Sequence, residues 1–294
     1  MSEAPRLVCI GNLTIDEAVS PSGEHVESVG GDALYAALAA RLVAGDPRIL
    51  APMGVDAPPA LLSALHLAGT EPESLPRRDL PLVRNVVRYD DTGGRTWQLS
   101  HGVEHFESMS VHPADVGPEA LGAPGILVSA MALHAQLELA SWLRAHTAAT
   151  IYFDPQEDYL AGNLEALLDA VQACDVFLPS EIEAAALAGT GDMVAAAAGF
   201  LALGPRVVVI KLAAAGCLLA TRERPQAVLL PTEVVEPVDS TGAGDAFCGA
   251  FATEHLRSGD AKAAAAAGAA AARVAVSGAG VSALLAAVSN GADR

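Results

Sequence analysis

Short apolar runs alternate with longer helical stretches in the second half of the chain. The apolar runs are residues 126–128, 151–153, 176–178 and 207–210, and the helical stretches between them are 134–145, 164–173, 181–187 and 193–203. Strands that are apolar throughout and separated by helices indicate a parallel sheet covered on both faces. Ligands bind such sheets at the carboxyl ends of the strands, so we expect a site there.

The segments before and after this region predict strands and helices in a less regular order. A buried strand is expected over 7–10, a helix over 33–43 with Asp32 as its N-cap, and a strand over 49–53. A helix is expected over 58–67, a two-strand meander over 217–230, and two closing helices over 244–256 and 261–276.

Two hairpins are predicted, over 18–29 and 83–99, the second around a turn at 90–94. Polar and apolar residues roughly alternate along the second hairpin, which gives each strand one solvated and one covered face. Such a sheet could cover a cleft as a lid or serve only as a structural edge, and the pattern leaves both open.

Composition narrows the class of protein. The chain has 294 residues, of which 52% are hydrophobic, so it can bury a large core. No apolar run is long enough to span a bilayer, and the N-terminus lacks the pattern of a secretion signal, so we expect a cytoplasmic protein. The four cysteines are far apart in the sequence and are expected to be free thiols.

The net charge restricts the possible binding partners. The formal net charge of −18 makes nucleic acid and anionic membranes improbable partners, because both need a positive surface. The only lysines are Lys211 and Lys262, so a bound phosphate would depend on backbone amides or a metal ion.

The segment Asp-Ser-Thr-Gly-Ala-Gly-Asp at 239–245 carries the strongest chemical signal. It follows an extended segment and precedes a helix, and its glycines allow a tight turn with convergent N–H groups. Amides at a helix N-terminus bind anions, and the carboxylate of Asp245 in the first turn could accept a proton from an attacking hydroxyl. A merely well-capped helix is the alternative that the residues leave open.

This segment closely resembles the D-T-x-G-A-G-D signature of the ribokinase-like sugar kinases, the PfkB family. The resemblance implies one ribokinase-like domain over 1–294: a Rossmann-like three-layer α/β core with a mostly parallel sheet, and a small β-sheet lid drawn from about 13–29 and 83–101. It implies that Asp245 is the catalytic base, and that the amides of Gly242, Ala243 and Gly244 stabilise the transferring phosphoryl group.

Two other regions extend the resemblance to the sugar side. Gly11-Asn12-Leu13-Thr14-Ile15-Asp16 is similar to the first strand of that family and the acidic residue beyond it, and Gly30-Gly31 before a helix is similar to its second signature. The resemblance implies that Asn12, Asp16, Gly30, Gly31 and Tyr35 bind the acceptor. Tyr35 stands where an asparagine is usual, and could stack on a base.

The nucleotide side is implied in the same way. Ser180-Glu181-Ile182-Glu183 resembles the N-x-x-E region, with serine in place of asparagine. The resemblance assigns Glu183 to Mg²⁺ and its waters. It assigns seven residues to nucleotide binding: Ser180, Lys211, Gly216, Thr241, Gly242, Gly244 and Gly280.

Together, the residues and the resemblance predict an ATP-dependent kinase that phosphorylates a hydroxyl of a small sugar or polyol, with ATP and Mg²⁺ and with a monovalent cation left open. A nucleoside kinase, or a non-catalytic sugar- or nucleotide-binding protein on the same fold, is the alternative. A homodimer through the lid is expected by analogy.

Other signals are set aside. No Gly-Lys pair exists, which excludes a Walker A loop. The G-x-G-x-x-A string at 278–283 has too little chain after it for a dinucleotide-binding unit. Residues 101–105 contain two histidines and a glutamate but lack metal-site spacing, and we expect a loop there.

Overall fold

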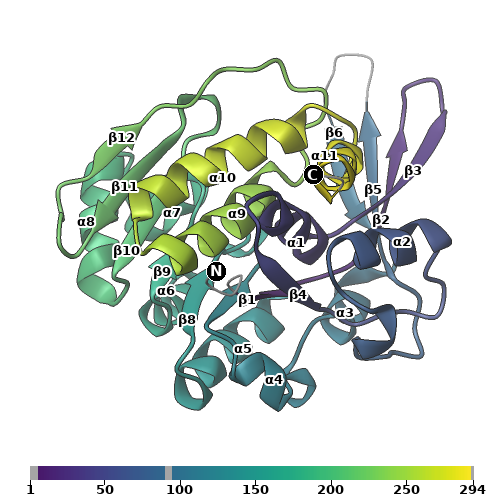
Figure 1. Cartoon of the computed structure of the whole chain (residues 1–294), viewed down its shortest axis with the longest axis horizontal. Coiled ribbons are helices and arrows are strands. Elements are labelled where there is room, and N and C mark those ends of the chain that lie inside the picture. Colours follow the sequence, from purple (N-terminus) through teal and green to yellow (C-terminus); the bar gives the residue numbers. More distant parts are fainter. Residues whose placement is uncertain (1–5, 90–94, 293–294) are drawn as a thin grey trace.

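The computed structural model describes residues 6–89 and 95–292 (Figure 1). Its main sheet has the order β12-β11-β10-β9-β8-β7-β1-β4, in which the neighbours from β4 to β10 are parallel and β10, β11 and β12 are antiparallel. The strands are β1 (Arg6–Ile10), β4 (Asp46–Leu50), β7 (Gly125–Val128), β8 (Thr150–Phe153), β9 (Val176–Phe177), β10 (Val207–Lys211), β11 (Cys217–Thr221) and β12 (Val228–Leu230). This sheet is the predicted α/β core.

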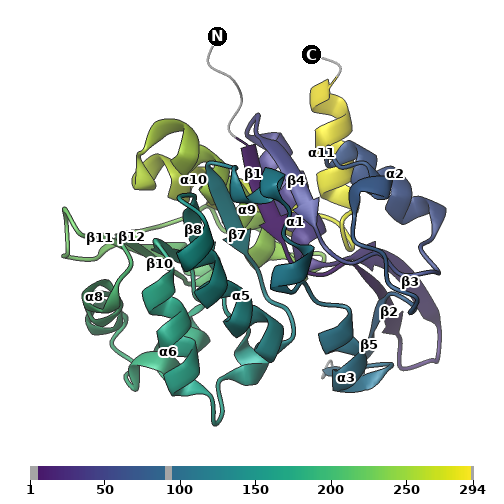
Figure 2. The same ribbon diagram turned by 90° about the horizontal axis from the view of Figure 1, so that it is seen from below.

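Helices cover both faces of the main sheet, as Figures 1 and 2 show. On one face lie α1 (Asp32–Leu42), α2 (Pro59–Leu67), α9 (Ala243–Ser258), α10 (Ala261–Val276) and α11 (Ser282–Ala292). On the other lie α5 (Leu133–His146), α6 (Leu164–Ala173), α7 (Glu181–Ala188) and α8 (Met193–Leu203). Because strand side chains alternate, Leu7 and Cys9 of β1 enter the first core while Val8 and Ile10 enter the second.

A small second sheet lies to one side of the core in both views (Figures 1 and 2). Its order is β3-β2-β5-β6, built from β2 (Thr14–Val19), β3 (His25–Gly30), β5 (Val83–Tyr89) and β6 (Arg95–Leu99). The outer pairs are antiparallel and the central pair β2/β5 is parallel. The predicted fold class, a mostly parallel core sheet plus a small second sheet, is confirmed.

Close packing between helices fixes the start of α9. A Cβ added to Gly249 would lie 2.0 Å from the carbonyl oxygen of Ala36, so only glycine lets the backbone of α9 approach α1 this closely. The two helices therefore hold the residues before α9 against the residues that open α1.

Several local expectations were wrong. Strand β4 begins three residues earlier than predicted. Asp32 is not an N-cap: Gly31 has that position, with φ 105°, and no side chain in the described residues caps the helix. Residues 102–108 form a short helix, α3 (Gly102–Ser108), where we expected a loop, and α4 (Pro118–Leu121) and α11 were not anticipated.

The cysteines and the length of the helices were also predicted from the sequence. All four cysteines are buried and free, as predicted. Within the described chain no single helix is long and apolar enough to cross a membrane, although the bent pair α7–α8 passes by length and composition alone. The turn at 90–94 and the first five residues, on which the location argument partly rests, lie outside the described residues.

Candidate active site

The N-terminus of α9 lies between a polar cleft and an apolar groove. The polar cleft, of about 410 Å³, is lined from α9 by Gly242 and Asp245. The apolar groove, of about 320 Å³, is lined from the same turn by Ala243 and Gly244. A group bound at this turn would therefore be reached from both sides.

The turn itself is built for an anion. Gly242 is the N-cap in a left-handed conformation, φ 73°, and among the described residues no side chain caps the helix. The alternative of a merely well-capped helix is therefore wrong. Uncapped N–H groups in a first helical turn, together with the helix dipole, attract negative charge.

Asp245 lines the polar cleft, directly after Gly244 of the apolar groove, and is partly exposed. Burial raises its pKa to about 6, the negative charge of Asp154 adds to this effect, and the ammonium of Lys211 opposes it. A carboxylate with such a pKa is ionised at neutral pH but binds a proton more readily than an ordinary aspartate, as a general base requires.

A buried ion pair supports the turn from below. The Nζ of Lys211 donates to Asp154 Oδ1 at 2.6 Å, and the Sγ of Cys248 donates to Asp154 Oδ2 at 3.2 Å. The same Nζ lies 3.5 Å from the position that a Cβ on Gly244 would occupy. Burial acts to lower the pKa of Lys211, but Asp154, Cys248 and Glu183 outweigh it, so the ammonium stays charged beneath the anion-binding turn.

The polar cleft gathers carboxylates from separate elements. Asp16 of β2 accepts a hydrogen bond from Asn85 Nδ2 of β5 at 2.8 Å, because the register of the small sheet places the two residues side by side. Asp32 accepts the backbone N–H of Asn12 at 2.9 Å. Burial raises the pKa of Asp16, and burial together with the nearby charge of Asp245 raises that of Asp32.

Tyr35 lies under the turn before α9 and borders the base of the polar cleft. It is 2% exposed, and a Cβ on Gly242 would lie 2.3 Å from its ring. Its hydroxyl has no hydrogen-bond partner among the described residues, and burial raises its pKa. Because only 2% of the residue is exposed and Gly242 covers the ring, the structure does not support stacking of a base on Tyr35.

Ser180 and Glu183 form a reciprocal cap at the start of α7. The Ser180 N–H donates to Glu183 Oε2 at 2.6 Å, and the Glu183 N–H donates to Ser180 Oγ at 3.2 Å. Burial raises the pKa of Glu183 to about 7, against the lowering effect of Lys211. Serine in place of asparagine thus has a structural role in holding this glutamate.

The apolar groove has a wall of apolar residues. Val235, Pro237, Phe247, Ala272 and Val276 line it. Arg273 at its edge donates to Thr232 Oγ1 at 2.8 Å. Apolar walls with a few polar groups suit a flat heterocycle.

The structure distributes the predicted site residues over four places. The polar cleft is lined by Asp16, Gly31, Tyr35, Thr241, Gly242, Asp245 and Gly280, and the apolar groove by Lys211, Gly216, Ala243 and Gly244. Gly30 packs on Asp16, and Asn12 lies buried behind the polar cleft, with Nδ2 3.4 Å from the carbonyl of Ala130. Ser180 and Glu183 line neither cavity. Thr241 and Gly280, expected on the nucleotide side, lie in the polar cleft instead.

Four residues in or near the polar cleft were given no role in binding or catalysis from the sequence: Asp32, Asn85, Asp154 and Asp239. Asp239 lines the cleft and accepts the N–H groups of Thr241 and Gly280. Asp154 follows the strand predicted at 151–153, so its place at a carboxyl strand end was a usable signal. Asn85 had none, because only the sheet register brings it to Asp16.

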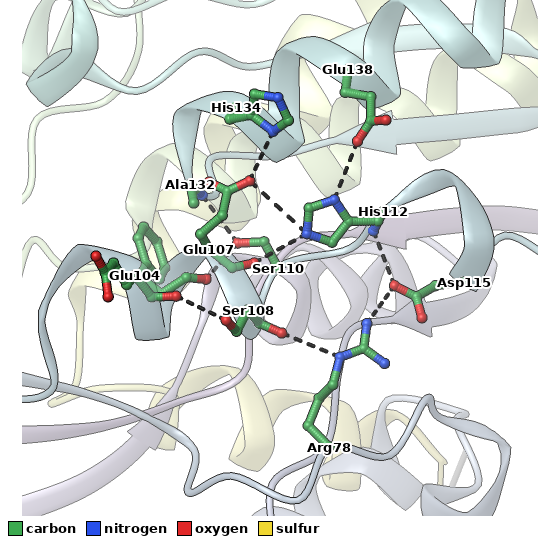
Figure 3. Close-up of polar contacts among 11 residues, drawn as sticks. Arg78, Glu104, Glu107, Ser108, Ser110, His112, Asp115, Ala132, His134 and Glu138 are labelled. Atoms are coloured by element: carbon green, nitrogen blue, oxygen red, sulfur yellow. Dashed lines mark hydrogen bonds and ion pairs between the residues drawn. The ribbon is translucent and has the colours of Figure 1, made fainter.

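A network of polar contacts ties the small sheet to the core through α3, which follows β6 (Figure 3). Glu107 of α3 contacts His134 Nδ1 at 3.2 Å and His112 at 3.9 Å, and His112 also contacts Glu138 at 3.3 Å. Arg78 donates to Asp115 at 2.6 Å. The contacts of Glu107 and His112 hold α3 and the segment after it against α5.

The fold and the site define an α/β protein with an uncapped helix N-terminus between a polar and an apolar cavity. The model of the pfkB family carbohydrate kinases matches residues 118–287, more than half of the chain, and the protein belongs to this family of kinases. The resemblance stated from the sequence is thereby confirmed.

Individual kinases are similar to this chain in sequence or in structure. A cytidine kinase of Thermococcus kodakarensis is 29% identical over 260 residues, which cover 85% of this chain and 88% of that protein. The structure of a ribokinase from Thermotoga maritima superposes with a TM-score of 0.76 at 23% identity, covering 99% of this chain and all of that one. A fructokinase of Vibrio cholerae, solved with fructose, ADP and calcium, gives 0.75 at 20% identity and covers 98% of each chain. The ribokinase-like fold is therefore confirmed.

Proposed function

We propose that this kinase transfers the γ-phosphate of ATP to a hydroxyl of a small sugar or polyol held in the polar cleft. One observation carries the proposal: an uncapped helix N-terminus with Asp245 in its first turn separates a polar cleft from an apolar groove. Phosphoryl transfer needs this order of parts, with the acceptor, the transferring group and the nucleotide in line.

Asp245 takes the proton of the acceptor hydroxyl as the oxygen attacks the γ-phosphorus. The bond from that phosphorus to the bridging oxygen breaks, and ADP leaves on the side of the apolar groove. The N–H groups of Ala243, Gly244 and Asp245 stabilise the charge on the equatorial oxygens, and one such donor can be worth about 2.7–4 kcal/mol. Lys211, held by Asp154 beneath the turn, adds a fixed positive charge.

Asp16 and Asn85 hold acceptor hydroxyls, since the carboxylate can only accept hydrogen bonds while the amide can donate and accept. On the other side of the turn, Gly216 and Ala272 bound the groove for the adenine. The small sheet is the proposed lid, and its strands Thr14–Val19 and Val83–Tyr89 carry Asp16 and Asn85 over the cleft.

The residues fit a magnesium ion that arrives with the nucleotide. Within the described residues no group of three or more His, Cys, Asp or Glu side chains is placed to hold a metal by itself. Mg²⁺ bound to nucleotide phosphates keeps several waters and needs only one or two carboxylates. Glu183 would hold such waters, and the ion would neutralise charge on the β- and γ-phosphates. Whether a monovalent cation also binds stays open.

A nucleoside is the second candidate for the acceptor. Its support is the likeness to a cytidine kinase over 85% of the chain, since Tyr35 no longer supports it. In that case the same cleft would hold the ribose, and the base would extend toward the small sheet. The single-domain organisation, the cytoplasmic location and a homodimer through the lid stay predictions.

The test is ATP consumption measured against a panel of polyols, free sugars and nucleosides. Phosphorylated product with a sugar or polyol supports the first candidate, and product with nucleosides alone supports the second. Tight binding of ATP and of a panel member without any product would overturn the kinase proposal in favour of a ligand-binding protein. Asp245→Asn serves as the catalytic control.

A further inference from the structure

The polar cleft has charge of one sign. Its acidic lining residues are Asp16, Glu17, Asp32, Asp158, Asp239 and Asp245, and the side chains that line it include no lysine, arginine or histidine among the described residues. Glu17 contacts His25, and the charge of Lys211 acts on Asp245 from the groove side. Asp16, Asp32 and Asp158 accept hydrogen bonds from uncharged donors: the amide of Asn85, the backbone N–H of Asn12 and, at 3.3 Å, the amide of Gln156. These three carboxylates are solvated or hydrogen-bonded, but within the described chain none of them is paired with a cation.

A second observation points to a ligand that completes this site. The hydroxyl of Tyr35 lies at the base of the cleft, is buried, and has no hydrogen-bond partner among the described residues. A buried hydroxyl without a partner is costly, so it is expected to gain one when the site fills. The negative charges of Asp16, Asp239 and Asp245 also raise the pKa of this hydroxyl, and acceptor groups of this kind would favour a ligand group rich in hydrogen-bond donors.

The balancing charge does not come from a metal held by the cleft. The described residues contain no group of His, Cys, Asp and Glu side chains arranged to hold a metal ion. Lys211, the nearest buried cation of the site, is already paired with Asp154 on the groove side of the turn. A positive or donor-only group is therefore expected on the acceptor itself.

We propose that the acceptor carries an amino group, and that the polar cleft selects it over the neutral or anionic counterpart. This inference rests on the proposed function and narrows its substrate class. Carboxylates only accept hydrogen bonds. An amino group donates two or three and a hydroxyl only one, so the amino group satisfies more of these carboxylates, whereas a carbonyl or carboxylate in its place is repelled. An ammonium gains charge attraction in addition. Two sources share this chemistry: amino sugars, and nucleosides whose base has an exocyclic amine.

Matched acceptors test the inference. Initial rates are measured with D-glucosamine, D-glucose and D-glucuronate, and separately with cytidine and uridine, which differ in an amino and an oxo group. The amino member of the responding set should show a kcat/KM about tenfold or more above its neutral counterpart, the range of one hydrogen bond to a charged group. Glucuronate should give no product. Equal or faster use of glucose and of uridine would overturn the inference.

This failure differs from a failure of the proposed function. Turnover of neutral acceptors alone leaves the kinase proposal standing and removes the amino preference. Absence of product with all five compounds, together with no difference in calorimetric affinity between glucosamine and glucose or between cytidine and uridine, would remove both.

A charge variant tests which residues carry the preference. Asp158→Asn removes one exposed carboxylate of the cleft, and the ratio of kcat/KM for the amino over the neutral acceptor should fall about threefold, the effect of one partly screened charge. Asp169→Asn, the same change on the exposed face of α6, should leave the ratio unchanged. Raising the salt concentration should lower the ratio for a charged ammonium but not for cytidine over uridine. A ratio that does not respond to Asp158→Asn would contradict the electrostatic basis.

Discussion

Replacement of Asp245 by asparagine separates catalysis from folding more sharply than any other single change. Asparagine has the same shape but cannot accept a proton at neutral pH. General bases of this kind contribute about 10²- to 10⁴-fold to the rate, so kcat should fall by that factor. The KM for ATP should change little, because the backbone amides of the turn are kept.

The raised pKa of the Asp245 carboxyl predicts how activity depends on pH in the native enzyme and in the variant. Because the pKa is raised to about 6, mainly by burial, the base is lost by protonation below that pH, and kcat/KM of the native enzyme should fall as the pH drops through about 6. Asp245→Asn should lose this pH dependence.

Stability should change in the opposite direction to activity. A carboxyl whose pKa is higher in the folded state loses stability as pH rises from about 4 to about 6, because the folded form then holds more protons than the unfolded one. A shift from 3.8 to about 6 corresponds to about 3 kcal/mol, and partial exposure reduces this to about 1–3 kcal/mol. At pH 7.5 the variant should therefore unfold at a higher urea concentration than the native protein.

The assay couples ADP release to a dye signal from pH 5 to pH 9, with urea unfolding on the same samples. Asp169→Asn is the matched control and should leave both measurements unchanged, since this aspartate lies on the exposed face of α6. A variant at position 245 with native kcat, or with a pH profile that still falls through 6, would refute the assignment of the base.

Three further changes test the surrounding site. Gly242→Ala should lower the free energy of unfolding by about 2–4 kcal/mol, because the backbone there is left-handed and the new Cβ would lie 2.3 Å from the ring of Tyr35. Gly189 is also left-handed but has open space around it, so Gly189→Ala should lower the free energy of unfolding by only about 1 kcal/mol. Both values come from the same urea titration. Lys211→Met should cost about 3–5 kcal/mol by leaving Asp154 as an uncompensated buried charge, also measured by unfolding. Asp16→Asn should raise the KM of the acceptor about 10- to 100-fold without changing that of ATP, in steady-state kinetics with each substrate varied.

Each of these has a clear contrary result. Equal unfolding free energies for the two glycine variants would show that the ring beneath Gly242 can move aside. A lysine variant as stable as the native protein would mean that the buried pair contributes nothing. An unchanged acceptor KM in the Asp16 variant would place the sugar elsewhere in the cleft.

The sequence by itself determined the layers of the fold and the chemistry of one turn. Apolar strands separated by helices specify a covered parallel sheet, because strands buried on both faces cannot alternate with polar residues. The glycines at 242 and 244 and the aspartate at 245 are consecutive in the chain, so the anion-binding turn and its carboxylate could be recognised without tertiary information. Helix α10 was predicted to the residue for the same local reason.

Tertiary structure alone decided what surrounds that turn. Asp16 and Asn85 meet through the pairing of β2 with β5. Lys211 at the end of β10 reaches Asp154, which follows β8, across the intervening strand β9, so no local pattern contains either contact. Asp32 looked like a cap because helix starts often carry aspartate, but the approach of Asn12 gave its carboxylate another partner. The charge of the polar cleft results from such long-range placement, since carboxylates far apart in the sequence affect one another only after folding brings them together.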